Sequence, residues 1–446
     1  MKEWMIRHNG FCKACNKAAA AMQPYADYVI SCGDPVAEGK NAVCLRVDSA
    51  IEGYVIRVEE AQEDTQTVEI VGQDEAHLFY GVCDFEAYYL PFAATREDRL
   101  RRQNTPCLFE QPLPAYLRRT KPRIRRRGIW TWGHTVYDYR RFIDHMVRLK
   151  MNTLILWNDY IPTNMEEVLA YAHENYVKVY LGYAWGWDVT MPDCIDEGYM
   201  DRVAERAVAT YREQYAALPC DGIYFQTVTE HANEEIGGVS VAEAVVNMVN
   251  RAGGRLLAEF PQLEILFGLH AMPVRNKLDI VAGVDGRISL IWEDAGTFPW
   301  HYYADDMSGF ADTVAFTRRI RDLRADGGFG GVLKGYVNLD WAAFRHQSGP
   351  APIGITHERQ LDTLSEQRRG FRRYFQAVWL RYAPKALELL QEFREDSLMT
   401  VLVEDACFEQ GIPFPAALYG EMLWDAHRDM GELLYEVGLR ADVQFD

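Results

Sequence analysis

Residues 221–231 read DGIYFQTVTEH, an apolar run that ends in a threonine, a glutamate and a histidine. The part at 223–228, IYFQTV, has the composition of a buried strand, because β-branched and aromatic residues suit a pleated surface. An ionisable Glu230 then stands where this strand should leave the core. The fold must therefore explain why a carboxyl group is placed at the end of a buried strand.

Similar apolar runs recur along the middle of the chain, with helical patterns between most of them. In 138–152, one side of a helix is shared by Phe142, Ile143, Met146, Val147 and Met151. Alternation of strands and helices predicts a parallel sheet, and uninterrupted apolar runs indicate strands that are buried on both faces. The other runs are RGIWTWG at 127–133, TLILWND at 153–159, VKVYLGYAWGW at 177–187, EILFGLHA at 264–271, RISLIWED at 287–294 and GVLKGYVNLDW at 331–341.

This number of strand–helix units, over about 230 residues, suits a (β/α)8 barrel. A doubly wound open sheet is the rival, but it usually has a glycine-rich phosphate loop after its first strand, and WTWGHT is not one. An eighth strand is not evident, because 341–356 reads as loop and 358–446 as helix-rich. We therefore expect an α/β fold with a TIM-like (β/α)8 barrel, a small α+β accessory domain before it and a helical segment after it.

Three domains follow from the changes in pattern. Residues 1–115 predict a small α/β accessory domain, with a hairpin of two strands at 53–60 and 66–73 joined by AQEDT. The Pro- and Arg-rich stretch at 111–127 reads as a linker. The barrel is expected over 116–356, and the helical C-terminal segment over 357–446.

Composition excludes several classes of function. The net charge of −18 argues against nucleic acid or an anionic membrane as a partner, because phosphate groups need a basic surface. Nine scattered cysteines fit reduced thiols, and the N-terminus MKEWMIRHNG lacks an apolar signal segment, so we expect a cytoplasmic protein. We expect no cofactor and no bound metal, and the acidic, aromatic-rich C-terminal segment could bury a homodimer interface.

Candidate functional residues lie at the C-terminal ends of the expected strands, because a (β/α)8 barrel performs its chemistry there. Tryptophan and tyrosine accompany polar groups at most of these ends, and the C–H faces of sugar rings stack on such side chains. This pattern points to a carbohydrate ligand. The residues expected to bind it are Trp132, His134, Asn158, Asp159, Trp185, His231, His270, Trp292, Glu293, Tyr336, Asn338 and Trp341.

Glu230 suits the role of a general acid in glycoside hydrolysis. Such a reaction needs a carboxylic acid to protonate the leaving oxygen and a second group to act at the sugar carbon. A pocket walled by tryptophan would raise the pKa of a carboxyl group and keep it protonated. Asp294 and Asp340 are the candidates for the second catalytic group, with Glu293 as a further option.

Other readings of these residues stay open. Each acid could be a structural group that orients a neighbouring loop, and the barrel could bind carbohydrate without cleaving it. His231, His270 and Glu230 could instead hold a metal in a metal-dependent hydrolase, although such barrels usually begin with an H-x-H motif and the first strand offers only His134.

The chain resembles the superfamily that contains family 20 β-hexosaminidases and family 67 and 115 α-glucuronidases. The stretch EGYVIRVEE, followed by TVEIVGQDEAHLFYGVCDF with Phe79, Tyr80 and Gly81, is similar to their accessory domain. RRRGIWTWG at 125–133 is similar to their first barrel strand. The resemblance covers roughly residues 53–341. It implies a glycosidase whose general acid corresponds to Glu230.

One departure from this superfamily concerns the residue before that acid. Family 20 enzymes carry neighbouring Asp and Glu residues after the fourth strand, whereas this chain carries Thr229 and Glu230. Family 67 enzymes use a lone glutamate there with carboxylates on later strands, which Asp294 and Asp340 could match. Lys334 and Arg345 are the nearby basic candidates for a uronate carboxylate. We therefore expect an exo-acting glycoside hydrolase whose sugar the sequence leaves open.

Overall fold

The computed structural model forms two compact units. Unit 1 comprises residues 1–122, 148–150 and 435–443, and unit 2 comprises 123–147, 151–434 and 444–446. The structure describes residues 4–8, 13–26, 28–32, 41–62, 65–93, 112–132, 136–186, 190–227, 229, 233–270, 272–293, 309–324, 327–337, 348–404 and 408–446.

Unit 1 is built on a six-stranded sheet with the order β2-β1-β3-β5-β4-β6. The expected hairpin is confirmed, because β4 and β5 pair antiparallel with Ile56 opposite Ile70. Its strands are β1 (Trp4–His8), β2 (Tyr28–Cys32), β3 (Asn41–Val47), β4 (Tyr54–Val58), β5 (Thr67–Gly72) and β6 (Tyr116–Thr120). Its helical segments are α1 (Lys13–Met22), α2 (Glu75–Asp84), the π-helical turn η1 (Phe85–Tyr89) and α3 (Leu90–Ala93).

A buried ionic cluster ties separate chain segments into unit 1. Asp84 is fully buried at the end of α2 and accepts a hydrogen bond from the hydroxyl group of Tyr54. The ammonium group of Lys150 lies 3.4 Å from this carboxylate, and Nε of Arg118 lies 3.3 Å from it. Because a buried ammonium group needs an opposite charge beside it, the contact between Lys150 and Asp84 fixes segment 148–150 to α2.

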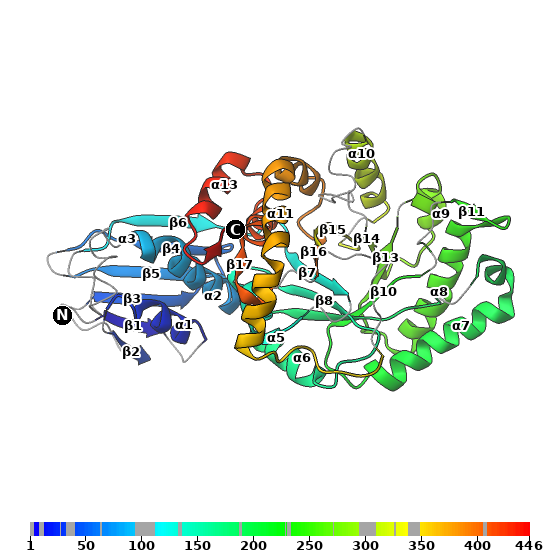
Figure 1. Cartoon of the computed structure of the whole chain (residues 1–446), viewed down its shortest axis with the longest axis horizontal. Coiled ribbons are helices and arrows are strands. Elements are labelled where there is room, and N and C mark those ends of the chain that lie inside the picture. The colour runs from blue at the N-terminus through cyan, green and yellow to red at the C-terminus, as the bar shows by residue number, and fades with distance from the viewer. Residues whose placement is uncertain are drawn as a thin grey trace. The chain divides into compact units, whose positions relative to one another are not determined.

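Unit 2 contains a closed barrel of eight parallel strands, which confirms the expected (β/α)8 fold (Figure 1). Around the barrel the strands follow chain order, and each is hydrogen-bonded to the next. They are β7 (Arg126–Trp132), β8 (Thr153–Trp157), β9 (Lys178–Gly182), β10 (Gly222–Phe225), β13 (Ile265–Leu269), β14 (Ile288–Trp292), β15 (Phe329–Val337) and β16 (Leu398–Glu404).

Helices follow most of the barrel strands and pack on their outer faces (Figure 1). In the described ranges, no helix is both long enough and apolar enough to span a bilayer. Between and after the barrel strands lie α5 (Tyr139–Arg148), α6 (Met165–Glu174), α7 (Glu197–Thr210) with the π-helical turn η3 (Tyr211–Tyr215), α8 (Val241–Glu259), α9 (Leu278–Val281), α10 (Phe310–Arg321), α11 (Glu358–Leu390) and α12 (Phe414–Trp424). The last helix, α13 (Met430–Leu439), begins in unit 2 and ends in unit 1. The 3-10 turns are η2 (Met191–Ile195), η4 (Met272–Val274) and η6 (Phe408–Gln410), and the short strands are β11 (Glu235–Ile236), β12 (Val239–Ser240), β17 (Ile412–Pro413) and β18 (Val443–Gln444).

The eighth barrel strand lies inside the segment that the sequence predicts to be helical. β16 (Leu398–Glu404) pairs with β15 on one side and with β7 on the other, and so closes the barrel. The regular alternation of strands and helices does not reveal this strand, because α11, at 33 residues, separates it from β15. The barrel therefore continues beyond residue 356, where the sequence pattern placed its end.

Aromatic rings fill the interior of the barrel. Trp130, Trp157 and Tyr224 are buried there, and the ring centre of Tyr224 lies 5.8 Å from each of the two indoles. Gly182 makes this possible, because a Cβ atom at that position would overlap the Trp157 side chain. Large side chains that face small ones pack efficiently inside a barrel, so the interior of this barrel is a packed core.

A polar group closes the N-terminal end of the barrel, and we call Arg126, Tyr180 and Glu264 the base cluster. Arg126 begins β7 and forms an ion pair with Glu264, which directly precedes β13. The hydroxyl group of Tyr180 donates to Oε2 of Glu264 across 2.7 Å. Burial, together with the charge of Glu264, raises the pKa of Tyr180.

Candidate functional site

A second polar group lies at the C-terminal end of the barrel, and we call Tyr224, Gln226, His270 and Glu293 the rim cluster. Glu293 follows β14 and is fully buried. Tyr224 donates a hydrogen bond to its Oε1, and the Gln226 amide donates one to its Oε2. Nε2 of His270 lies 3.1 Å from Oε2. The cluster therefore joins three neighbouring strands around one carboxylate.

The contact between His270 and Glu293 is electrostatic rather than an aligned hydrogen bond. Nε2 is within ion-pair distance of the carboxylate, yet its N–H direction does not meet hydrogen-bond geometry. Such contacts often tighten only when a substrate is bound.

Space for the rim cluster comes from a glycine. A Cβ atom on Gly268, in β13, would overlap both Oε1 of Glu293 and the hydroxyl oxygen of Tyr224. The ring of Tyr224 meanwhile packs against the interior indoles of Trp130 and Trp157. The interior indoles therefore hold the ring of Tyr224 in place, and the absence of a side chain at Gly268 lets the Tyr224 hydroxyl group reach the Glu293 carboxylate.

Thr229 lies at this same end of the barrel. It follows β10, is fully buried, and its Oγ1 lies 3.4 Å from the backbone nitrogen of His270, which donates to it. Glu230 and His231 lie outside the described residues. The residue before Glu230 is thus anchored to the segment after β13, where barrel enzymes hold their reacting groups.

Two of the tryptophans that were expected to bind sugar, Trp185 and Trp292, are buried. Trp185 is buried, and its ring stacks on Phe225 with centres 3.6 Å apart. Trp292 is also buried and packs edge-to-face on Phe316 of α10. Phe225 follows the interior residue Tyr224, and Trp292 follows the interior residue Ile291. Side chains alternate along a strand, so Phe225, the Trp185 ring stacked on it, and Trp292 lie on the outer side of the barrel wall. In these positions neither ring offers a face to a sugar, which departs from the sequence expectation.

The remaining expected site residues divide into three groups. Trp132 is partly exposed above the interior core, Asn158 is buried and Asp159 is partly exposed, so these three lie at the C-terminal ends of β7 and β8. Tyr336 and Lys334 lie in β15, but the structure does not describe their side chains. The residues outside the described ranges are His134, Glu230, His231, Asp294, Asn338, Asp340, Trp341 and Arg345.

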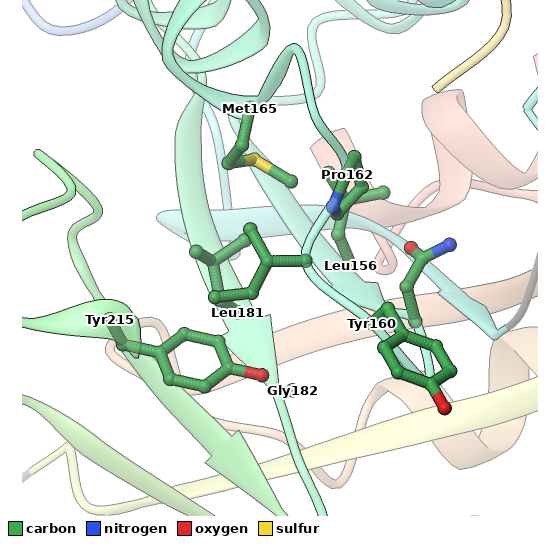
Figure 2. Close-up of a pocket in the computed structure, with 9 residues that line it drawn as sticks. Leu156, Tyr160, Pro162, Met165, Leu181, Gly182 and Tyr215 are labelled. Carbon is green, nitrogen blue, oxygen red and sulfur yellow. The ribbon is translucent and has the colours of Figure 1, made fainter. Parts of the chain in front are cut away.

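A small pocket lies beside the ends of β8 and β9 (Figure 2). It holds about 200 Å³ of empty space, part of it open to solvent, which is smaller than typical ligand pockets of roughly 300–1,000 Å³. The ring of Tyr215 forms one side of this pocket. Burial raises the pKa of its hydroxyl group. The walls of the pocket are mostly apolar: Leu156, Asn158, Tyr160, Ile161, Pro162, Met165, Leu181, Gly182 and Tyr215. Leu156 and Leu181 alternate with interior residues, so the pocket lies outside the barrel wall.

A second buried carboxyl group belongs to the segments that follow the strand ends. Glu409 lies in η6, after β16, and accepts a 2.6 Å hydrogen bond from the backbone N–H of Tyr137, which follows β7. Burial raises the pKa of Glu409 to about 7, against the lowering effect of its backbone hydrogen bonds. Its charge therefore changes near neutral pH and is coupled to the hydrogen bond that joins these two segments.

Sequence reasoning missed Tyr224 and Gly268, and it did not assign Gln226 to the site. The signal that could have found them is the alternation of side chains along a strand. Tyr224 and Gln226 are two residues apart, as are Gly268 and His270, and Glu293 is two residues after Ile291, which faces the interior. Residues two apart point to the same side, so interior residues predict which strand-end residues converge.

Sequence comparisons give no relatives. No protein-family model matches the chain, and no curated protein sequence matches it.

In the parts of the chain that the structure describes, no group of three or more histidine, cysteine, aspartate or glutamate side chains is arranged to hold a metal ion.

Solved structures do resemble this chain. A mutant Streptomyces plicatus beta-hexosaminidase in complex with product (GlcNAc) aligns with 99% of this chain and 92% of its own, at 12% identity and a TM-score of 0.51. A GH138 enzyme targeting pectin rhamnogalacturonan II aligns with 96% of this chain and 52% of its own, at 10% identity and a TM-score of 0.50. This chain thus spans about half the length of that enzyme.

A third similar structure is a family GH115 4-O-methyl-alpha-glucuronidase with specificity for decorated arabinogalactans. It aligns with 94% of this chain and 56% of its own, at 11% identity and a TM-score of 0.47. The first two alignments confirm the expected resemblance at the level of the fold, because this chain shares the TIM-barrel fold of those two glycoside hydrolases. At these identities the likeness establishes the fold alone.

Proposed function

We propose that this protein is an exo-acting glycoside hydrolase in which Glu230 is the general acid. The observation that carries the proposal is the position of Thr229, which is buried at the C-terminal end of β10 and accepts a hydrogen bond from the backbone of His270. Glu230 is the next residue, so the chain is anchored immediately before it. In a glycosidase fold, a carboxyl group at this strand end is suited to protonate a glycosidic oxygen.

The second catalytic group is proposed to be Asp294 or Asp340. Both follow barrel strands, β14 and β15, as does Glu230 after β10. Glu293 is a poor candidate for direct attack or for activating water, because it is fully buried and both of its oxygens already accept hydrogen bonds. A nucleophile or base must reach the sugar carbon or a water beside it, which a sealed carboxylate cannot do.

Assistance by an acetamido group of the substrate is not part of this proposal. The resemblance to family 20 places an aspartate before the acid, to steer that group, and this chain has Thr229 there. The threonine is buried and its hydroxyl group accepts from the backbone of His270. Sugars without an acetamido group are therefore the preferred candidates, although GlcNAc is the product bound to the similar hexosaminidase.

The test is a screen of the purified protein against chromogenic glycosides, together with the Glu230→Gln variant. The panel includes α-glucuronide, β-glucoside, β-N-acetylglucosaminide and β-N-acetylgalactosaminide, with fragments of rhamnogalacturonan II as larger substrates. We expect turnover of one sugar, and a loss of roughly 100-fold or more in kcat for Glu230→Gln, as expected when an acid catalyst is removed. Full activity in the variant would exclude Glu230 as the acid.

A protein that binds a glycan from this panel without cleaving it would support the alternative of a carbohydrate-binding barrel. Glycan binding would be measured by calorimetry with the same oligosaccharides. Release of single sugars from the end of an oligosaccharide, seen by chromatography of the products, is expected from an exo-acting enzyme. Release of internal fragments would contradict that part of the proposal.

A further inference from the structure

The members of the rim cluster differ in their access to solvent. The Glu293 side chain is 0% exposed, whereas the His270 side chain is 16% exposed. Gln226 and Tyr224 are buried as well. Of the four described residues in the cluster, His270 is therefore the one that a ligand at the barrel mouth can touch, and Glu293 can act on such a ligand only through the imidazole.

Three features hold His270 in place. Its backbone N–H donates to Oγ1 of the buried Thr229 across 3.4 Å. Its Nε2 lies 3.1 Å from Oε2 of Glu293. Two residues earlier, Gly268 leaves the space that the Glu293 carboxylate occupies. Both the main chain and the ring of this histidine are thus positioned by buried groups on neighbouring strands.

The charge of the carboxylate determines what the imidazole can do. With Glu293 ionised and facing Nε2, a proton on Nε2 is favoured over an empty lone pair, because two acceptors would otherwise face each other. In the neutral ring this leaves Nδ1 as the hydrogen-bond acceptor. In the protonated ring both nitrogens donate, and the nearby carboxylate stabilises the charge.

We infer that Glu293 is a positioning residue that holds the imidazole of His270, and that His270 hydrogen-bonds a hydroxyl group of the sugar at the barrel mouth. The second part rests on the proposed glycosidase function, whereas the first part does not. Glu293 therefore affects the substrate without touching it. A sugar hydroxyl can both donate to and accept from an imidazole, so it fits either protonation state.

The first experiment requires no substrate. Protein labelled with ¹⁵N in its histidine rings is titrated and followed by NMR, and the His270 signal is assigned by its loss in His270→Asn. In Glu293→Gln we expect the titration midpoint of His270 to fall by roughly 1 to 3 pH units, because the stabilising negative charge is removed. The matched control is Glu264→Gln in the base cluster, which removes a charge from the other end of the same barrel.

An unchanged midpoint in Glu293→Gln, or an equal fall in Glu264→Gln, would overturn the positioning role. Should Glu293→Gln fail to fold, Glu293→Asp provides the test, because it keeps the charge and moves it away from the ring. A smaller fall in the midpoint is expected there. No fall in that variant would likewise contradict the inference.

The second experiment uses the chromogenic glycoside that the wild-type protein cleaves. We expect His270→Asn to raise KM roughly 10-fold with a smaller change in kcat, as for a hydrogen bond made in both the ground state and the transition state. We expect Glu293→Gln to raise KM as well, and Glu264→Gln to leave KM unchanged. Wild-type kinetics in His270→Asn would overturn the sugar contact, whereas a wild-type protein that cleaves nothing would disprove the proposed function and leave the NMR result decisive for Glu293.

Discussion

The two ends of the barrel each carry a glutamate hydrogen-bonded to an interior tyrosine, but they differ in burial and in charge balance. In the base cluster, Glu264 is 34% exposed and forms an ion pair with Arg126. In the rim cluster, Glu293 is fully buried and is held by two neutral donors, with His270 as the nearby titratable group. The base cluster is therefore typical of a stabilising ion pair, whereas the rim cluster holds a fully buried carboxylate beside a partly exposed histidine.

This difference follows the division of labour in (β/α)8 barrels, in which the N-terminal face serves stability and the C-terminal face serves chemistry. A partly exposed ion pair can be replaced by water at little cost, because both charges remain solvated when the pair is broken. A sealed carboxylate has no such alternative, so each donor around it matters more. Substitutions at the two ends should therefore have unequal effects.

The largest effect is expected from Gly268→Ala. The added methyl group would overlap Glu293 and Tyr224, so the rim cluster would have to separate and lose a buried hydrogen bond. We expect a loss of roughly 4 kcal/mol in the free energy of unfolding, measured by urea denaturation. The control is Gly254→Ala in α8, where a Cβ atom meets open space and a small gain of about 0.4 to 1 kcal/mol is expected. Equal stabilities of the two variants would show that the rim cluster is not tightly packed.

The next effect concerns Glu409 and depends on pH. Its pKa is about 7 in the folded protein and 4.5 without perturbation, so the folded state binds the proton more tightly than the unfolded state does. Stability therefore falls as the pH rises from about 4.5 to about 7, and the full cost is present above pH 7. We expect Glu409→Gln to be more stable than wild type at pH 8, by on the order of 3 kcal/mol.

The advantage of Glu409→Gln should shrink as the pH is lowered towards 4.5, which thermal unfolding at several pH values would measure. The amide oxygen of the variant can still accept from the backbone N–H of Tyr137. An exposed Glu395→Gln variant, taken from the pair with Arg125, serves as the control and should show no comparable trend. A pH-independent difference for Glu409→Gln would mean that the carboxyl group is not protonated near neutral pH.

The barrel itself was largely predictable from sequence. Runs such as TLILW at 153–157 and ISLIW at 288–292 are apolar throughout, as strands buried on both faces must be, and they formed β8 and β14. The eighth strand, Leu398–Glu404, could not be found by the same rule, because α11 breaks the regular spacing of strands and helices. Its place in the barrel is fixed by pairing with β7, which is distant in sequence.

The candidate site was predictable only in part. The sequence placed His270 and Glu293 at strand ends, and the structure has them there, but the sequence did not say which way each side chain points. Trp185 and Trp292 were expected to bind sugar, but both are buried, Trp185 against Phe225 and Trp292 against Phe316 of α10, since indoles supply large apolar areas that cores readily use. The roles proposed for Glu230, Asp294 and Asp340 stay predictions, because these residues lie outside the described ranges.

A matched pair of tyrosine substitutions sharpens the comparison of the two ends. Tyr224→Phe removes a donor from the sealed Glu293, and Tyr180→Phe removes one from the partly exposed Glu264. We expect Tyr224→Phe to cost about 1 to 3 kcal/mol, because a buried acceptor loses its partner, and Tyr180→Phe to cost about 0.5 to 1.5 kcal/mol. Both are measured by urea denaturation at pH 7. A larger loss in Tyr180→Phe would reverse the proposed ranking of the ends.

The smallest effect is expected from Glu264→Gln. The amide can still accept from Tyr180, and Arg126 still donates to the carbonyl oxygen of Gly327 at 2.8 Å, so this guanidinium keeps a hydrogen-bond partner. Because the side chains of Arg126 and Glu264 are 24% and 34% exposed, water compensates much of the lost ion pair, and we expect a cost below about 1 kcal/mol. Raising the salt concentration should reduce the difference from wild type, since screening already weakens the pair. A loss of several kcal/mol, insensitive to salt, would mean that the base carboxylate is as dependent on its partners as Glu293 is at the rim.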